Sequence, residues 1–183
     1  MVPVIISNNT MRDAINVRAM HAFAERTGRD VQWYHALDVH KRSEIKDPVL
    51  IENLEKQHSG QMKHRLRRML LVMGMLVSIN QNFDVRVGVV NGSWGFLWRV
   101  QYQTNEDEKR YLTSSVVEVV GSNPVDIAQL PKHHFPVLPD VMEITYEHSA
   151  SHWRCMIKRK QVPMEPGFAI TAHKAQGDRK SVV

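Results

Sequence analysis

The sequence has little cysteine and no long apolar run, and each absence excludes a class of protein. Its one cysteine, Cys155, cannot form an internal disulfide, which is typical of a chain kept in a reducing compartment. No stretch approaches the roughly 18 apolar residues of a membrane-spanning helix. The first residues, MVPVIISNN, lack the basic region and the long apolar region of a signal peptide. We therefore expect an intracellular protein with no membrane partner.

A loop for nucleotide phosphates is also missing from these residues. No segment matches G-x-x-x-x-G-K-[ST], in which backbone N–H groups and a lysine bind the phosphates. Gly88, Gly92 and Gly95 have the spacing of turns, and no Lys-Ser or Lys-Thr pair follows them. No Walker B segment is found either. We expect this chain by itself to bind neither ATP nor magnesium and to have no catalytic residue for ATP hydrolysis.

Basic residues are in modest excess. The 24 lysines and arginines against 19 acidic residues give a net charge of +5 and a pI of about 9.5. This suits a polyanionic partner without requiring one. The run KHRLRR at 63–68 is usually a solvated face in sequences of this kind, although contact with DNA or RNA is the alternative. Lys158, Arg159 and Lys160 form a second basic cluster.

The first third of the chain alternates between strands and helices. An apolar run at 2–6 predicts a buried strand, after which Thr10 can cap a helix and Gly28 can end it. The inward face of this helix is expected to contain Met11, Ile15, Ala19, Ala22 and Phe23. A second strand is predicted at 31–36, and Asp47 with Pro48 begins a second helix. This order indicates an α/β domain.

The middle of the chain has a different pattern, from Met69 to about Lys160. Short apolar runs broken by turns predict a small antiparallel barrel inserted into the α/β domain. Tyr102 and Tyr111 flank an acidic turn and are expected to form a hairpin. The methionines at 62–75 are interpreted as core residues. The four tryptophans are also expected in the core, with Trp94 the most exposed of them.

The α/β pattern returns near the end. Phe168 to Ala172 is a short apolar run, followed by the polar segment HKAQG. In open α/β sheets, ligands bind at the carboxyl ends of strands. The segment after residue 170 is therefore a candidate ligand site.

Three segments resemble superfamily 1 DNA helicases of the petite integration frequency and RecD-like group. QVPMEPGFAITAHKAQG at 161–177 is similar to their motif V, and 72–97 is similar to the segment that enters their accessory barrel. VIISNNTMRDAIN at 4–16, with the strand that follows it, resembles the motif IV region. The three segments occur in the family's order. One position departs from it, because this chain has Asn8 where many relatives have an arginine.

The resemblance implies a fold class, a division into domains and a function. It implies a partial second RecA-like domain at 1–66, a Src-homology-type β-barrel at 67–160, and a return to the RecA-like domain at 161–183 that is cut short. The parent would be an ATP-dependent DNA helicase of the nucleus or mitochondrion, using ATP and Mg²⁺ and moving 5′ to 3′. The N-terminal RecA-like domain of the same polypeptide would be its missing partner.

The resemblance also implies roles for particular residues. Thr171, His173 and Lys174 would contact single-stranded DNA, with Lys158 and Lys160 adding positive charge. Gln176, Gly177 and Arg12 would couple the strand to the nucleotide. A hydroxyl, a helix-start N–H and a cation suit a phosphate, and a histidine can stack on any base.

Other interpretations of these residues remain open. The segment 171–177 is also compatible with a capped helix that follows a core strand. The whole chain is also compatible with a non-enzymatic nucleic-acid-binding module, a degenerate transposon-derived helicase remnant, or an interaction domain without a nucleic-acid role. His148 and His152 have a spacing that metal ligands use on a helix, but the local pattern is that of a strand and predicts no metal.

Overall fold

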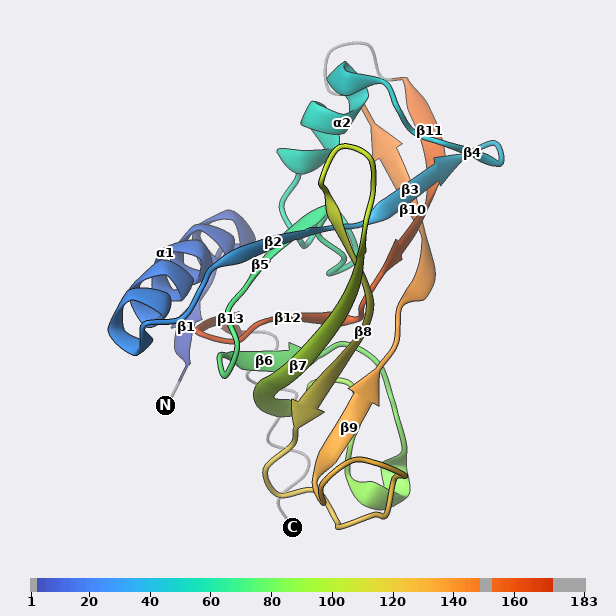
Figure 1. The fold of residues 1–183 in the computed structure, drawn as a ribbon. Coiled ribbons are helices and arrows are strands. Elements are labelled where there is room, and N and C mark those ends of the chain that lie inside the picture. The colour runs from blue at the N-terminus through green and yellow to red at the C-terminus, as the bar shows by residue number, and fades with distance from the viewer. Residues whose placement is uncertain (1–2, 149–152, 173–183) are drawn as a thin grey trace.

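The computed structural model describes residues 3–148 and 153–172, which form three β-sheets and two α-helices (Figure 1). The helices are α1 (Asn9–Thr27) and α2 (Pro48–Glu55), and a short 3₁₀ turn spans Val85–Val87. The strands are β1 (Val4–Ile6), β2 (Gln32–His35), β3 (Leu37–His40), β4 (Ser43–Glu44), β5 (Arg68–Leu71), β6 (Leu76–Ile79), β7 (Trp94–Thr104), β8 (Arg110–Glu118), β9 (His134–Val137), β10 (Asp140–Glu147), β11 (Arg154–Gln161), β12 (Met164–Pro166) and β13 (Ala169–Thr171).

The first strand and the last described strand pair side by side. β1 and β13 are parallel, with Val4 opposite Ala169 and Ile6 opposite Thr171. The prediction of a buried first strand is wrong in one respect, because Val4 and Ile5 are 54% and 60% exposed. Within the described residues β13 is the only strand that β1 pairs with.

Helix α1 is present as predicted, but its N-terminal cap and its buried face differ from the prediction. Asn8 rather than Thr10 is the cap, and its side chain accepts a hydrogen bond from the backbone N–H of Met11. Gly28 ends the helix in the left-handed conformation, as expected, with φ of 64°. The inward face is turned relative to the prediction, since Met11 and Ala22 are exposed. The buried residues are Arg12, Asn16, Met20 and Ala24.

The second helix follows the prediction. Asp47 caps α2 by accepting hydrogen bonds from the backbone N–H groups of Val49 and Leu50, and Pro48 occupies the first turn. Leu54 is 1% exposed and lies in a small core with Tyr146 and Ile157. This core joins α2 to the four-stranded antiparallel sheet β10-β11-β3-β4.

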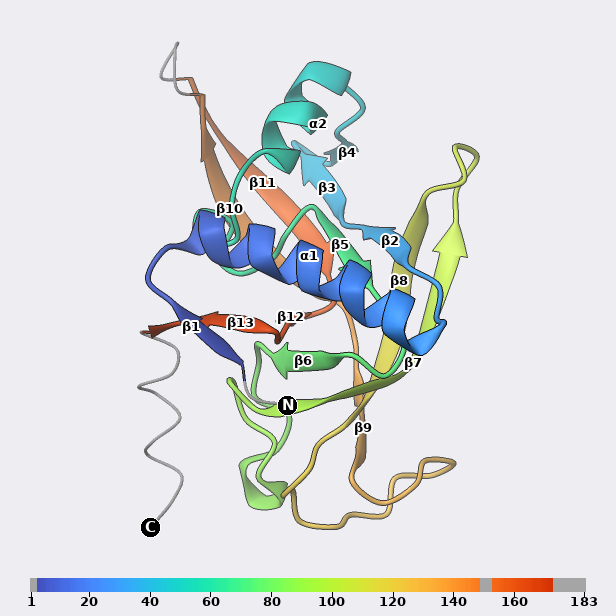
Figure 2. The ribbon, with the colours of Figure 1, turned by 90° about the vertical axis from the view of Figure 1, so that its left-hand side faces the viewer.

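The largest sheet has seven strands and curls into a nearly closed, barrel-like form (Figure 2). Its strand order is β12-β6-β7-β8-β2-β5, and β9 adds to β8. The predicted hairpin is confirmed, because β7 and β8 are antiparallel around 105–109. The sheet takes β2 from before residue 67 and β12 from after residue 160, so strand pairing crosses both of the expected domain boundaries.

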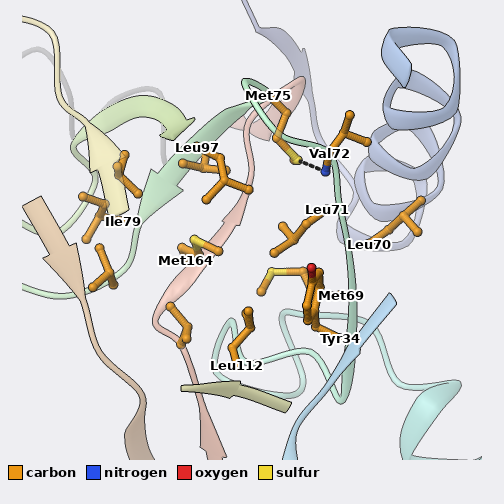
Figure 3. Packing of buried hydrophobic residues seen from close by; sticks show 14 of the residues in the cluster. Tyr34, Met69, Leu70, Leu71, Val72, Met75, Ile79, Leu97, Leu112 and Met164 are labelled. Carbon is orange, nitrogen blue, oxygen red and sulfur yellow. Dashed lines mark hydrogen bonds between the residues drawn. The ribbon is translucent and has the colours of Figure 1, made fainter. Parts of the chain in front are cut away.

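The core of the barrel-like sheet is rich in methionine and aliphatic side chains (Figure 3). Met62, Met69 and Met75 are each at most 2% exposed, as predicted for the methionine-rich segment. The Met75 sulfur accepts a hydrogen bond from the Val72 backbone N–H at 3.2 Å. The prediction for the tryptophans is wrong, because Trp98 and Trp153 are 43% and 49% exposed.

Among the described residues, neither helix has the combination of length and apolar character that crossing a membrane requires. Within the same residues no group of three or more potential ligands is placed to hold a metal ion. His152 lies outside the described residues, so the spacing of His148 and His152 is not tested.

Candidate nucleic-acid interface

Thr171 is the predicted site residue that the structure places at the end of a parallel strand. Ala169 and Ile170 are buried, and Thr171 is half-buried at the last position of β13. Asn16 on α1 holds this strand from the side. Its Oδ1 accepts from the Ala169 backbone N–H at 2.8 Å, and its Nδ2 donates to the Ala169 carbonyl at 3.1 Å. Because Asn16 is buried, these bonds fix β13 against α1 in a dry environment.

The structure brings Thr171 to the basic run at 63–68. A cavity of about 340 Å³ is lined by Thr171, by Met142 on β10, and by Lys63, His64, Arg65, Asn80 and Asn91. Lys63 and His64 reach it from a tight turn in which both have a positive φ, of 48° and 58°. Lys63 is exposed and makes no ion pair within the described residues. A hydroxyl, a lysine and amide groups around one hollow suit a phosphate or sugar of a strand. We call this hollow the Thr171 pocket.

The basic run is not the solvated face that its composition predicts. Arg65 and Arg67 are 2% and 7% exposed. Arg65 donates two hydrogen bonds to Asp140, at 3.1 and 2.7 Å, and Arg67 donates to Asp38 at 2.5 Å. The charges of these arginines are therefore paired inside the protein, which leaves Lys63 and Arg68 as the exposed cations of the run.

Arg12 belongs to a buried ion network that reaches the Thr171 pocket. Its guanidinium is 2% exposed, pairs with Asp13 at 2.7 Å, and contacts the Ser59 hydroxyl and Glu165, the latter at 3.7 Å. Glu165 in turn lies 3.3 Å from Nδ1 of His64, which lines the pocket. Arg12 is thus linked to the pocket through two side chains. Its predicted role in nucleotide coupling stays a prediction.

Lys158 and Lys160 lie away from Thr171. Both are exposed on β11, whereas Arg159 between them points to the opposite face and is fully buried against Asp38. Met142, which lines the Thr171 pocket, is the register partner of Arg159, so the pocket lies on the Arg159 side of this sheet. Lys158 instead faces Glu143 at 3.6 Å. The structure therefore does not gather the two lysines at the site that was predicted with them.

His173, Lys174, Gln176 and Gly177 lie outside the described residues, and their predicted roles are untested. Asn16, Lys63 and Met142 belong to the site but were not predicted as parts of it. Lys63 had a signal in the basic run, and Asn16 had one as a polar residue spaced one turn from Arg12 and Met20. Met142 had none, because only the folded sheet brings it near Thr171.

The chain resembles known proteins in structure. No family model matches the sequence, and no curated protein matches it either. Solved structures of helicases resemble the chain. They are Pif1 helicases, and their likeness covers nearly the whole of this chain, at low sequence identity.

Three of these Pif1 structures illustrate the likeness. Pif1 helicase from Candida albicans is 18% identical, with a TM-score of 0.56 over 97% of this chain and 37% of its own. A double mutant of Pif1 helicase from Bacteroides is 14% identical, with a TM-score of 0.54 over 96% of this chain and 32% of its own. Pif1 helicase from Bacteroides in complex with ADP-AlF3 and ssDNA is 15% identical, with a TM-score of 0.53 over 96% of this chain and 32% of its own. The chain thus spans about a third of the length of these proteins and shares the fold of that part.

Proposed function

We propose that this chain is the part of an ATP-dependent DNA helicase that contacts single-stranded DNA and transmits that contact to the nucleotide. The α/β elements, α1 with β1 and β13, would belong to a second RecA-like domain, which the barrel-like sheet interrupts. The parent would use ATP and Mg²⁺, and the partner of this chain would be the other RecA-like domain. Support for the nucleotide comes from Bacteroides Pif1, which has been solved with ADP-AlF4.

The observation that carries the proposal is the position of Thr171. It ends a parallel strand, where α/β sheets bind ligands, and it opens onto a pocket with Lys63 and Asn91. Pif1 from Bacteroides, whose fold this chain shares in part, has been solved bound to ssDNA. A phosphate in the Thr171 pocket would find a hydroxyl and an ammonium group without any contact that reads the base.

Anisotropy of a labelled oligonucleotide tests the proposal. Thr171→Val keeps the β-branched shape and removes the hydroxyl, and Lys63→Gln removes the charge. Each loses one polar or charged contact and should weaken binding by about 1 kcal/mol, roughly fivefold, for every base sequence. Thr145→Val, on an exposed face of β10, is the matched control. Unchanged affinity in both pocket variants, with the fold intact, would leave the core-strand interpretation of 171–177 as the better one.

The network behind the pocket suggests the path of coupling. His64 lines the pocket and contacts Glu165, and Glu165 contacts Arg12. A DNA strand that binds in the Thr171 pocket and shifts His64 would change the environment of Arg12. Glu165→Gln should therefore change ATP hydrolysis by the full-length parent at saturating DNA more than it changes DNA affinity. A parallel loss of both, or of neither, would count against this coupling path.

A further inference from the structure

A second cavity lies on the other side of the four-stranded sheet. It measures about 550 Å³ and lies between the outer half of the β7–β8 hairpin and the β2–β3 junction. His35, Glu44, Gln103, Tyr111 and Lys160 contribute its main polar side chains. We call it the hairpin pocket. Figure 1 shows the hairpin beside the β2–β3 segment, and His35 on β2 pairs with Tyr111 on β8.

Within the described residues, these polar side chains form no hydrogen bonds or ion pairs with the protein. Their neighbours behave differently. Lys158, two residues from Lys160, faces Glu143 at 3.6 Å, and His40 is hydrogen-bonded to the Met156 carbonyl at 2.9 Å. A concave site with several converging, unpartnered polar groups is typical of ligand binding.

Two rings supply an aromatic wall. The rings of His35 and Tyr111 have centroids 6.2 Å apart and planes inclined by 48°. Burial lowers the pKa of His35 and raises the pKa of Tyr111, so it favours the uncharged form of both rings. Gln101 pairs with Ser114 and Tyr102 with Leu112, which leaves Thr113 as a bulge in the pocket wall. Bulges of this kind redirect nearby side chains.

We propose that the hairpin pocket accepts one unpaired nucleobase of single-stranded DNA. The proposal rests on the function proposed above and adds a second contact to it, separate from the Thr171 pocket. The base would stack against Tyr111 and His35. Lys160 would donate to a carbonyl or ring nitrogen of the base, and Glu44 would accept from one of its N–H groups. A planar ring with both donors and acceptors on its edge fits this set of groups, and Lys160 favours a polyanion.

The experiment compares two labelled strands of equal length, one with bases and one in which every site is abasic. Both carry the same phosphates, so only the first can fill the hairpin pocket. Stacking contacts weaken by roughly 5- to 150-fold when the aromatic ring is removed. Tyr111→Leu in the 183-residue chain should lower the affinity for the strand with bases by an amount in that range. Its affinity for the abasic strand should be unchanged.

Two further variants guard against a trivial loss of fold. Tyr111→Phe keeps the ring and should bind the strand with bases within about threefold of the original chain, because stacking supplies most of the contact. Tyr102→Leu is the matched control, since Tyr102 is an exposed tyrosine of the same hairpin outside the pocket. Its affinity for both strands should be unchanged.

The outcomes separate the two proposals. If the original chain binds neither strand, the proposed function fails and this inference fails with it. If the original chain binds and Tyr111→Leu binds equally well, only the base pocket is overturned, and a peptide becomes the better candidate occupant. An equal loss for both strands would also overturn it, because the loss would not depend on bases.

Discussion

Asp38 is buried between two arginines, and its replacement by asparagine should strongly destabilise the protein. The carboxylate is fully buried and accepts from Arg159 at 2.7 and 2.8 Å and from Arg67 at 2.5 Å. Arg159 also donates to the carbonyl of Arg65 at 2.7 Å, so one carboxylate ties β3, β11 and the 65–67 segment together. The Asp38→Asn change keeps the size of the side chain and removes its charge.

The expected loss follows from what is left behind. An asparagine offers one acceptor oxygen and an NH2 group to guanidinium groups that can only donate. Arg159 loses its buried counter-charge, and Arg67 keeps only Glu55, at 3.7 Å. Removing one partner of a buried ion pair costs about 3–5 kcal/mol. A domain's whole stability is about 5–15 kcal/mol, so this loss removes between roughly a fifth and all of it.

Urea unfolding followed by circular dichroism measures this loss. Glu143→Gln is the matched control, because Glu143 faces Lys158 at 3.6 Å with both side chains more than half exposed. An exposed pair contributes less than about 1 kcal/mol. Arg159→Met combined with Asp38→Leu should cost less than Asp38→Asn alone, since it removes one cation along with the carboxylate. A loss below about 1 kcal/mol for Asp38→Asn would refute the reasoning.

Three further outcomes are expected. Asn16→Ala orphans the buried backbone N–H and carbonyl of Ala169 and should cost roughly 1–3 kcal/mol for each, measured by urea unfolding; a loss under about 0.5 kcal/mol would contradict it. Burial lowers the pKa of His35, so the unfolded chain binds that proton more tightly. The stability from neutral His35 is therefore complete above the unfolded pKa of about 6.5 and declines on acidification toward the lower folded pKa, and His35→Gln should flatten that part of the stability profile. The 183-residue chain alone should release no phosphate from ATP, with or without single-stranded DNA, because its sequence contains no G-x-x-x-x-G-K-[ST] segment. Turnover above a buffer blank would disprove this.

Local signals in the sequence predicted local structure well. Gly28 ends α1 because glycine readily adopts the left-handed conformation. Asp47 begins α2 because its side chain accepts hydrogen bonds from the first turn of the helix. The β7–β8 hairpin followed from its acidic turn and its flanking tyrosines. The apolar run at 168–172 was recognised from the sequence, and Ala169 and Ile170 in it are buried. A similar run at 2–6 was misleading, because Val4 and Ile5 of β1 are exposed.

The sequence misled where a charged residue has its partner far along the chain. Arg12 contacts Ser59, 47 residues away, and Asn16 contacts Ala169, 153 residues away, so the buried face of α1 is polar at these positions. The apolar periodicity of the helix therefore predicted only part of the buried face: Ala19 and Phe23 pack against the core, whereas Met11 and Ala22 are exposed. Arg65 and Arg67 are buried for the same reason, since Asp140 and Asp38 lie 75 and 29 residues from them.

Net charge is consequently a poor guide to where this chain would contact a polyanion. The buried arginines are paired with carboxylates, which neutralise their positive charge and weaken its attraction for a phosphate at the surface. The exposed cations near the two pockets are lysines, Lys63 at one and Lys160 at the other. Each phosphate contact on a single strand changes the logarithm of affinity by about 0.7 for each tenfold change in salt. A strand that contacted only these two lysines would therefore show a shallow salt dependence, and its affinity would have to come from hydroxyl contacts and stacking.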